Sequence, residues 1–154
     1  MNSPSTVLGR SLTQRKFRVL VAVTLIILTV QGWSGGTVNI FYAPSSGVTP
    51  PPYTLAGFFS AVQSLGGLLI WHASEGIFLF FLAVAVFALS FVWSKSRVVR
   101  ITSGLGLLFV LFAALGGFEF VMSGFANGGN SAQMDGSFMG SYAFYFITLY
   151  YARS

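Results

Sequence analysis

The chain has 154 residues, of which 55% are hydrophobic, 17% are aromatic and only 7% are charged, and its net charge is +5 at pH 7. Soluble domains carry about 25% charged residues, so this composition excludes a water-soluble globular domain and predicts an integral membrane protein. The absence of cysteine excludes disulfides, thiolate metal clusters and covalently attached c-type heme, and the single histidine, His72, excludes a multi-histidine zinc site.

Four apolar stretches are predicted to cross the bilayer as helices, because a span needs about 20 mostly apolar residues. They cover residues 17–33, 65–93, 101–125 and 132–151, and the fourth begins with a polar first turn. Residues 1–16 are polar and predict a frayed tail ahead of a single domain, residues 17–152. The fold class is therefore all-α, an integral membrane four-helix bundle.

The basic residues give this bundle an orientation. They precede the first span, lie between the second and third, or follow the fourth, and they are Arg10, Arg15, Lys16, Arg18, Lys95, Arg97, Arg100 and Arg153. The positive-inside rule then predicts a multi-pass protein of the cell membrane with both termini cytoplasmic. Because the charges are few and next to membrane spans, they do not indicate a nucleic-acid partner.

The connections on the outer side differ in character. Residues 34–65 begin with Gly35 and Gly36 and contain Pro44 and a proline run at 50–52, which predicts irregular chain. Within them, residues 53–62 are apolar and uncharged and predict a short helix along the outer interface. The second outer connection, residues 126–136, is rich in glycine, asparagine, serine and glutamine.

A weak internal repeat relates the second and fourth spans. Aligning residues 71–78 (WHASEGIF) with residues 138–145 (FMGSYAFY) sets His72 opposite Met139. The residue one turn later is small in both, Gly76 and Ala143, and Gly140 thins the fourth span further. An ionisable residue in a span is a functional candidate by default. Core histidines and gap-filling methionines are nevertheless common.

A heme held between two helices needs this pattern, with one axial ligand from each helix at matched depth and small neighbours that admit the macrocycle. His/Met is a recognised axial pair, and helix bundles build cofactor sites between facing helices. We therefore expect heme b, with His72 and Met139 as iron ligands, Gly76, Gly140 and Ala143 lining the site, and Trp71 as a propionate donor. Copper, or no cofactor at all, is the alternative.

These residues resemble one half of the heme A synthase type of membrane protein, a four-helix unit with a histidine near the outer end of its second and fourth helices. The motifs that carry the resemblance are Gln31-Gly32, His72 with Gly76, Gly116-Gly117, and Met139 with Ala143. The resemblance implies a heme-binding bundle. The synthase glutamate and arginine beside the first histidine are replaced by Leu69 and Ala73, which argues against heme hydroxylation.

Two acidic residues are further candidates. Glu119 and Glu75 lie near the outer ends of the predicted spans, where a carboxyl group can take part in a proton path or bind a quinol hydroxyl. A structural hydrogen bond to a neighbouring helix is the plainer interpretation.

The sequence thus supports two functions from different classes. The first is a membrane-bound b-type cytochrome, a small subunit of a respiratory or other redox complex that carries electrons near the outer face, with quinone as a possible partner. The second is a cofactor-free structural subunit that packs against the other membrane subunits of a larger complex. Either one is closer to an accessory subunit than to a catalyst.

Overall fold

The computed structural model describes residues 4–42 and 49–152, with side chains from residue 13 to 41 and from 49 onward. Every regular element in these ranges is a helix, in the order α1 (Pro4–Tyr42), α2 (Leu55–Ser64), α3 (Gly67–Trp93), α4 (Arg97–Met122) and α5 (Gly128–Tyr151). The side chain of Arg10, together with Pro44 and Arg153 from the orientation and loop predictions, lies outside the described residues.

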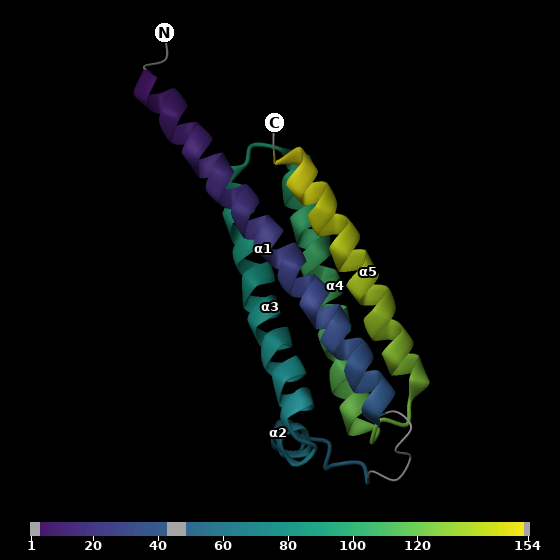
Figure 1. The fold of residues 1–154 in the computed structure, drawn as a ribbon. Helices are drawn as coiled ribbons and strands as arrows, with labels where there is room; N and C mark the ends of the chain where they lie inside the picture. The colour runs from purple at the N-terminus through teal and green to yellow at the C-terminus, as the bar shows by residue number, and fades with distance from the viewer. Residues whose placement is uncertain (1–3, 43–48, 153–154) are drawn as a thin grey trace.

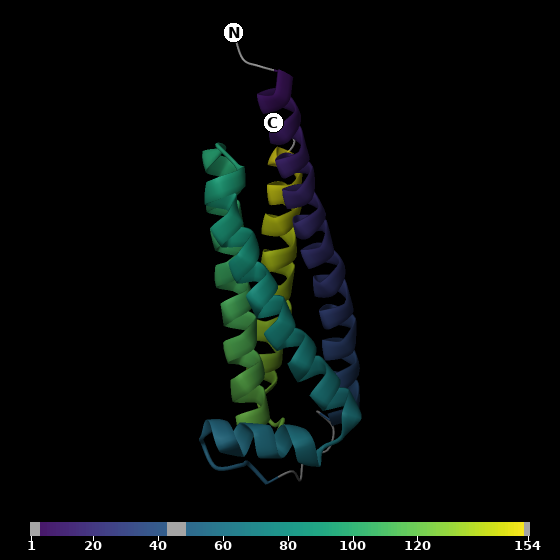
Figure 2. The ribbon, with the colours of Figure 1, turned by 90° about the vertical axis from the view of Figure 1, so that its left-hand side faces the viewer.

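The four long helices lie side by side, and α2 crosses one end of them (Figures 1 and 2). Helix α5 packs most closely against α4, while α1 contacts α3 and α5, and α3 contacts α4. The start of α1, the end of α5 and the α3–α4 connection share one end. The opposite end, which carries α2 and the α4–α5 connection, is called the α2 end below.

Three of these helices are long and apolar enough to cross a membrane: Thr13–Phe41 within α1, Gly67–Trp93 and Arg97–Met122. This supports the sequence prediction of a membrane protein. Helix α5 has 24 residues, but its first third is polar, and it does not reach the same apolar threshold.

Helix α1 differs most from the sequence prediction. It starts at Pro4 instead of Phe17, because proline fits the first turn of a helix, where its missing N–H costs no hydrogen bond. It also continues past Gly35 and Gly36 to Tyr42, where the sequence predicted irregular chain from residue 34. Gly35 does not end the helix. It leaves space for a neighbouring side chain, because a Cβ at this position would lie only 3.0 Å from Cε1 of His72.

The interfacial helix predicted over residues 53–62 forms as α2. Thr54 caps it by accepting a hydrogen bond from the Gly57 N–H at 3.0 Å. Its inner face covers a cluster that includes Val62, Leu69 and Phe120, at the α2 end of the long helices.

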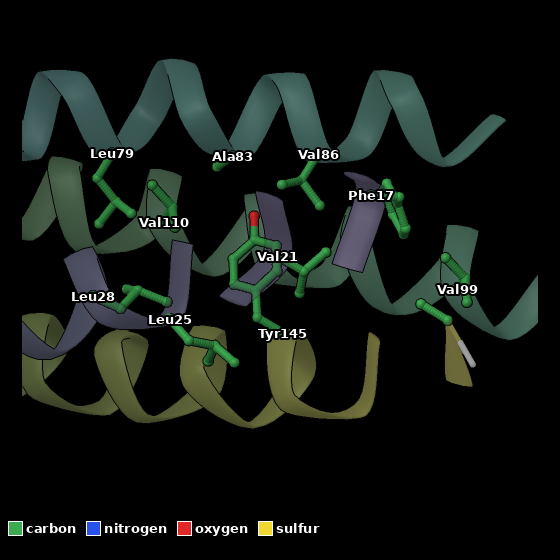
Figure 3. Close-up of a cluster of buried hydrophobic side chains, with 11 residues drawn as sticks. Phe17, Val21, Leu25, Leu28, Leu79, Ala83, Val86, Val99, Val110 and Tyr145 are labelled. Atoms are coloured by element: carbon green, nitrogen blue, oxygen red, sulfur yellow. The ribbon is translucent and has the colours of Figure 1, made fainter. Parts of the chain in front are cut away.

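The main core fills the centre of the four long helices (Figure 3). It joins residues of all four: Phe17, Val21, Leu25, Leu28, Leu79, Ala83, Val86, Val99, Val110, Tyr145 and Ala152. Glycines let these helices approach closely. A Cβ on Gly106 would lie 2.8 Å from Cζ of Tyr145, so the glycine leaves room for the far end of the tyrosine ring.

Candidate functional site

The only histidine lies in a polar cluster between α1 and α3 near the α2 end. Gln31 and Ser34 are three residues apart on α1, and His72 and Glu75 are three residues apart on α3. This spacing puts each pair on one helix face, and the two faces meet. Gly35 on α1 leaves the space that the imidazole ring fills.

Short hydrogen bonds connect the cluster. The Ser34 Oγ lies 2.8 Å from Nδ1 of His72 and 3.1 Å from Oε2 of Glu75. The Gln31 amide nitrogen lies 3.2 Å from each ring nitrogen of His72. At the exposed edge of the cluster, Nε1 of Trp71 donates to the same Glu75 oxygen at 3.2 Å.

Proton counting assigns the histidine tautomer. The Ser34 hydroxyl has one proton, and the Glu75 carboxylate is its strongest acceptor. If the Ser34 proton goes to Glu75, and not to the Gln31 carbonyl oxygen at 3.1 Å, Nδ1 of His72 is the donor to Ser34 and Nε2 accepts from the Gln31 amide. The result is a chain of hydrogen bonds from Gln31 through His72 and Ser34 to Glu75. Oε1 of Gln31 is buried without a partner among the described residues.

The chain of contacts is not a nucleophilic triad. In such a triad the carboxylate orients the histidine, and the serine reaches the substrate. Here Glu75 bonds the serine instead of the imidazole, and Ser34 is 1% exposed. The arrangement ties α1 to α3.

Met139 lies apart from this cluster. Its side chain is 65% exposed, and Ala143, one turn later, is exposed on the same face of α5. Its neighbour Phe138 is the residue that faces α1 at this level, and its ring would lie 2.7 Å from a Cβ on Gly32. Consecutive residues of a helix point about 100° apart, so the neighbour of Phe138 turns away from α1.

The residues present do not fit a heme between His72 and Met139. Two of the three small residues expected to admit a macrocycle, Gly76 and Gly140, pack against the protein's own side chains, while Ala143 is exposed. A Cβ on Gly76 would lie 3.2 Å from the Gln31 amide nitrogen, and one on Gly140 would lie 2.6 Å from the ring of Phe109. Both nitrogens of His72 already have hydrogen-bond partners. Heme binding by this chain stays a prediction from the sequence, and absorption spectroscopy can test it.

Glu119 lies at the α2 end of α4, where the sequence placed it. Its carboxylate accepts a hydrogen bond from the Tyr53 hydroxyl, in the segment before α2. The Tyr53 ring also packs edge-on against Phe118, with ring centroids 5.6 Å apart. The hydrogen bond to Glu119 raises the pKa of Tyr53 above its usual value, because ionising the phenol would lose that bond.

A metal site receives no geometric support from the described part of the chain. It contains no group of three or more histidine, aspartate or glutamate side chains gathered as metal ligands. Glu75 and Glu119 each bond to their own neighbours, and Asp135 lies on the exposed face of α5. Copper binding therefore stays a prediction.

Sequence reasoning missed Ser34 and Tyr53. Ser34 follows Gln31 by three residues, a spacing that puts both on one helix face, but the sequence predicted that the first span ends at Trp33. Tyr53 is distant from Glu119 in sequence, and no local pattern signals their pairing.

Comparison with known proteins adds no family assignment. No protein-family model, no curated protein and no solved structure matches this chain. The resemblance to heme A synthase halves therefore rests on the short motifs given above.

Proposed function

We propose that this chain is a multi-pass structural subunit of a larger membrane complex, with four helices crossing the cell membrane and both termini in the cytoplasm. In this role it contributes helix surface to an assembly. The observation that carries the proposal is the filling of the interior. Phe138, Gln31 and Phe109 pack against Gly32, Gly76 and Gly140 near the predicted heme, which leaves the exposed helix faces as the surface that a partner can contact.

Helix α5 supplies the fourth crossing in this proposal. Its 24 residues extend about 36 Å at 1.5 Å per residue, enough for a hydrocarbon core of about 30 Å. It packs along α4, which is itself apolar enough to cross. A hydrogen bond of 2.7 Å between Thr102 and Thr148 links the two helices in their buried contact.

The distribution of charge supports the orientation. Lys95 and Arg97 lie at the α3–α4 connection, at the same end as the start of α1. Glu75 and Glu119 lie towards the α2 end. The positive-inside rule assigns the basic end to the cytoplasm and the α2 end to the outer side.

Two measurements test this function. A reporter fused after Ser154 should be active only in the cytoplasm, and an outer location would overturn the orientation. Extraction of native membranes into polymer-bounded lipid discs should give a particle whose protein mass clearly exceeds the 16.6 kDa of one chain. Particles that contain a single chain would overturn the assignment as a subunit.

A further inference from the structure

Asp135 differs from the other two acidic residues of the chain. The carboxylate of Glu75 accepts hydrogen bonds from Ser34 and Trp71, and that of Glu119 accepts one from Tyr53. Asp135 is exposed on α5 and has neither a hydrogen bond nor an ion pair with any described residue. It is the one acidic side chain of the three without a polar partner among the described residues.

The contacts between α4 and α5 give the depth of Asp135. A Cβ on Gly116 would lie 3.1 Å from the carbonyl oxygen of Asn130 and 3.4 Å from the backbone nitrogen of Met134, so this turn of α5 is level with Gly116. Gly116 precedes Met122, the end of the α4 span, by six residues, or about 9 Å along the helix. Asp135 lies further along α5, so in the proposed function, where α5 is the fourth crossing, its carboxylate lies at least about 9 Å from the α2 end of the α4 span.

A carboxylate at this depth is costly when it faces lipid. Ionisable side chains in membrane spans almost always face protein or a water-filled cavity and pair with another group. The exposed side of α5 around Asp135 is also unlike a lipid-facing surface, since it holds Ala132, Gln133, Gly136 and Met139. The exposed side of α3, in contrast, carries large apolar residues such as Ile77, Phe78 and Phe81.

We propose that the outer half of α5 is a docking surface for a transmembrane helix of a different subunit, and that this helix carries a lysine or arginine at the depth of Asp135. The proposal rests on the proposed function and names the chemistry of one partner. An opposite charge in a low-dielectric setting is the group that best compensates a carboxylate. Gly136 assists, because nothing lies within 4 Å of its Cβ position and a partner backbone can approach closely.

A second copy of this chain does not supply the required charge. The eight lysine and arginine residues of the sequence are at positions 10, 15, 16, 18, 95, 97, 100 and 153, before or early in the first predicted span, between the second and third, or after the fourth. Copies in one membrane share one orientation, so a symmetric pair through α5 would bring two Asp135 carboxylates together. Charge complementarity therefore favours a different subunit.

The test uses the full chain in lipid vesicles, labelled at an added C-terminal cysteine, which is unique because the chain has no other. The probes are synthetic helices of about 20 leucine and alanine residues with lysine, leucine or glutamate at the midpoint. Asp135 precedes the middle of α5 by four to five residues, so a midpoint residue lies within about 7 Å of its depth in either insertion direction, a gap that a lysine side chain can bridge. Energy transfer should show the lysine helix binding at least roughly tenfold more tightly than the leucine helix, a difference of about 1.4 kcal/mol.

Variants locate the contact. Asp135→Asn should remove the preference for lysine, and Gly136→Leu should weaken binding of the lysine helix. Gly36→Leu is the matched control, because Gly36 is an exposed helical glycine of α1 with nothing within 4 Å of its Cβ position. It should leave binding unchanged. Circular dichroism confirms that each variant keeps its helix content.

Three results would overturn the proposal: equal binding of the lysine and leucine helices, a lysine preference that survives Asp135→Asn, or energy transfer between copies of the chain that Gly136→Leu removes. None of these results alters the native particle mass, so failure of this proposal and failure of the subunit assignment are distinguishable.

Discussion

The hydroxyl oxygen of Ser34 lies 2.8 Å from Nδ1 of His72, and this contact joins α1 to α3 near the α2 end of the molecule. The same oxygen lies 3.1 Å from Oε2 of Glu75, so one buried hydroxyl links an imidazole to a carboxylate. Ser34 belongs to a helix whose continuation past residue 33 was not expected from the sequence.

Loss of this hydroxyl should weaken the pairing of α1 with α3. Ser34→Ala removes the bridge between His72 and Glu75 and should destabilise the protein by between about 0.6 kcal/mol, the average measured for hydrogen bonds between membrane helices, and about 1.7 kcal/mol, the largest value. Thr24→Val is the matched control, because the buried Thr24 hydroxyl bonds only the Leu20 carbonyl of its own helix. Equal losses in both variants, measured by detergent-induced unfolding, would contradict a role for the bridge.

Removal of a buried hydroxyl should stabilise the centre of the molecule. Tyr145 is fully buried, and its hydroxyl has no hydrogen-bond partner among the described residues. Tyr145→Phe keeps the ring and should raise the free energy of unfolding by about 1 kcal/mol, since an unsatisfied buried donor carries a penalty of about 1–3 kcal/mol. Tyr142→Phe removes a hydroxyl from a partly exposed tyrosine and should have little effect. A destabilised Tyr145→Phe would show that the hydroxyl has a partner.

Close packing at Gly140 should make even one methyl group costly. A Cβ there would lie 2.6 Å from the ring of Phe109, which stacks on Phe144. Gly140→Ala should destabilise the α4–α5 pair by about 1–3 kcal/mol, as overpacking does. Gly136→Ala, on the same helix with nothing within 4 Å, should be neutral or slightly stabilising. Adding Phe109→Leu to Gly140→Ala should restore part of the loss, and no recovery would argue against this clash.

Tyr53 should titrate above its ordinary pKa of 10. Because the pKa is raised in the folded state, the stabilisation from the bond to Glu119 is complete below pH 10 and is lost as the pH rises through the folded pKa. The tyrosinate absorbance of the protein minus that of Tyr53→Phe isolates this residue. Glu119→Gln should bring the pKa of Tyr53 back towards 10. An unchanged Tyr53 titration in this variant would show that Glu119 does not cause the shift.

The heme prediction has a direct spectroscopic test. Because Met139 is exposed and the glycine positions are filled, we expect protein purified with heme supplied to show no Soret band that depends on these residues. A Soret band lost in both His72→Ala and Met139→Ala would establish the axial pair and show that the helices rearrange around a heme. A copper-dependent band lost only in His72→Ala would favour the metal alternative.

Much of the secondary structure followed from composition and charge. Long apolar stretches favour helices in a membrane because backbone groups have no water to bond, and α3 spans Gly67–Trp93 where the sequence predicted 65–93. The prediction failed for α1 because Gly35 and Gly36 were interpreted as a break. Glycine weakens a helix, but tertiary packing overrides that preference where a neighbour such as His72 needs the space.

The sequence by itself determined that the chain is helical and apolar, and which residues are ionisable within the apolar helices. The partner of each of those residues was decided only by tertiary structure. A shift of one residue turns a helical side chain by about 100°, so the alignment of His72 with Met139 could not show that Phe138 faces α1. For the same reason, only the tertiary structure showed that Asp135 is exposed on α5, while Glu75 and Glu119 are paired.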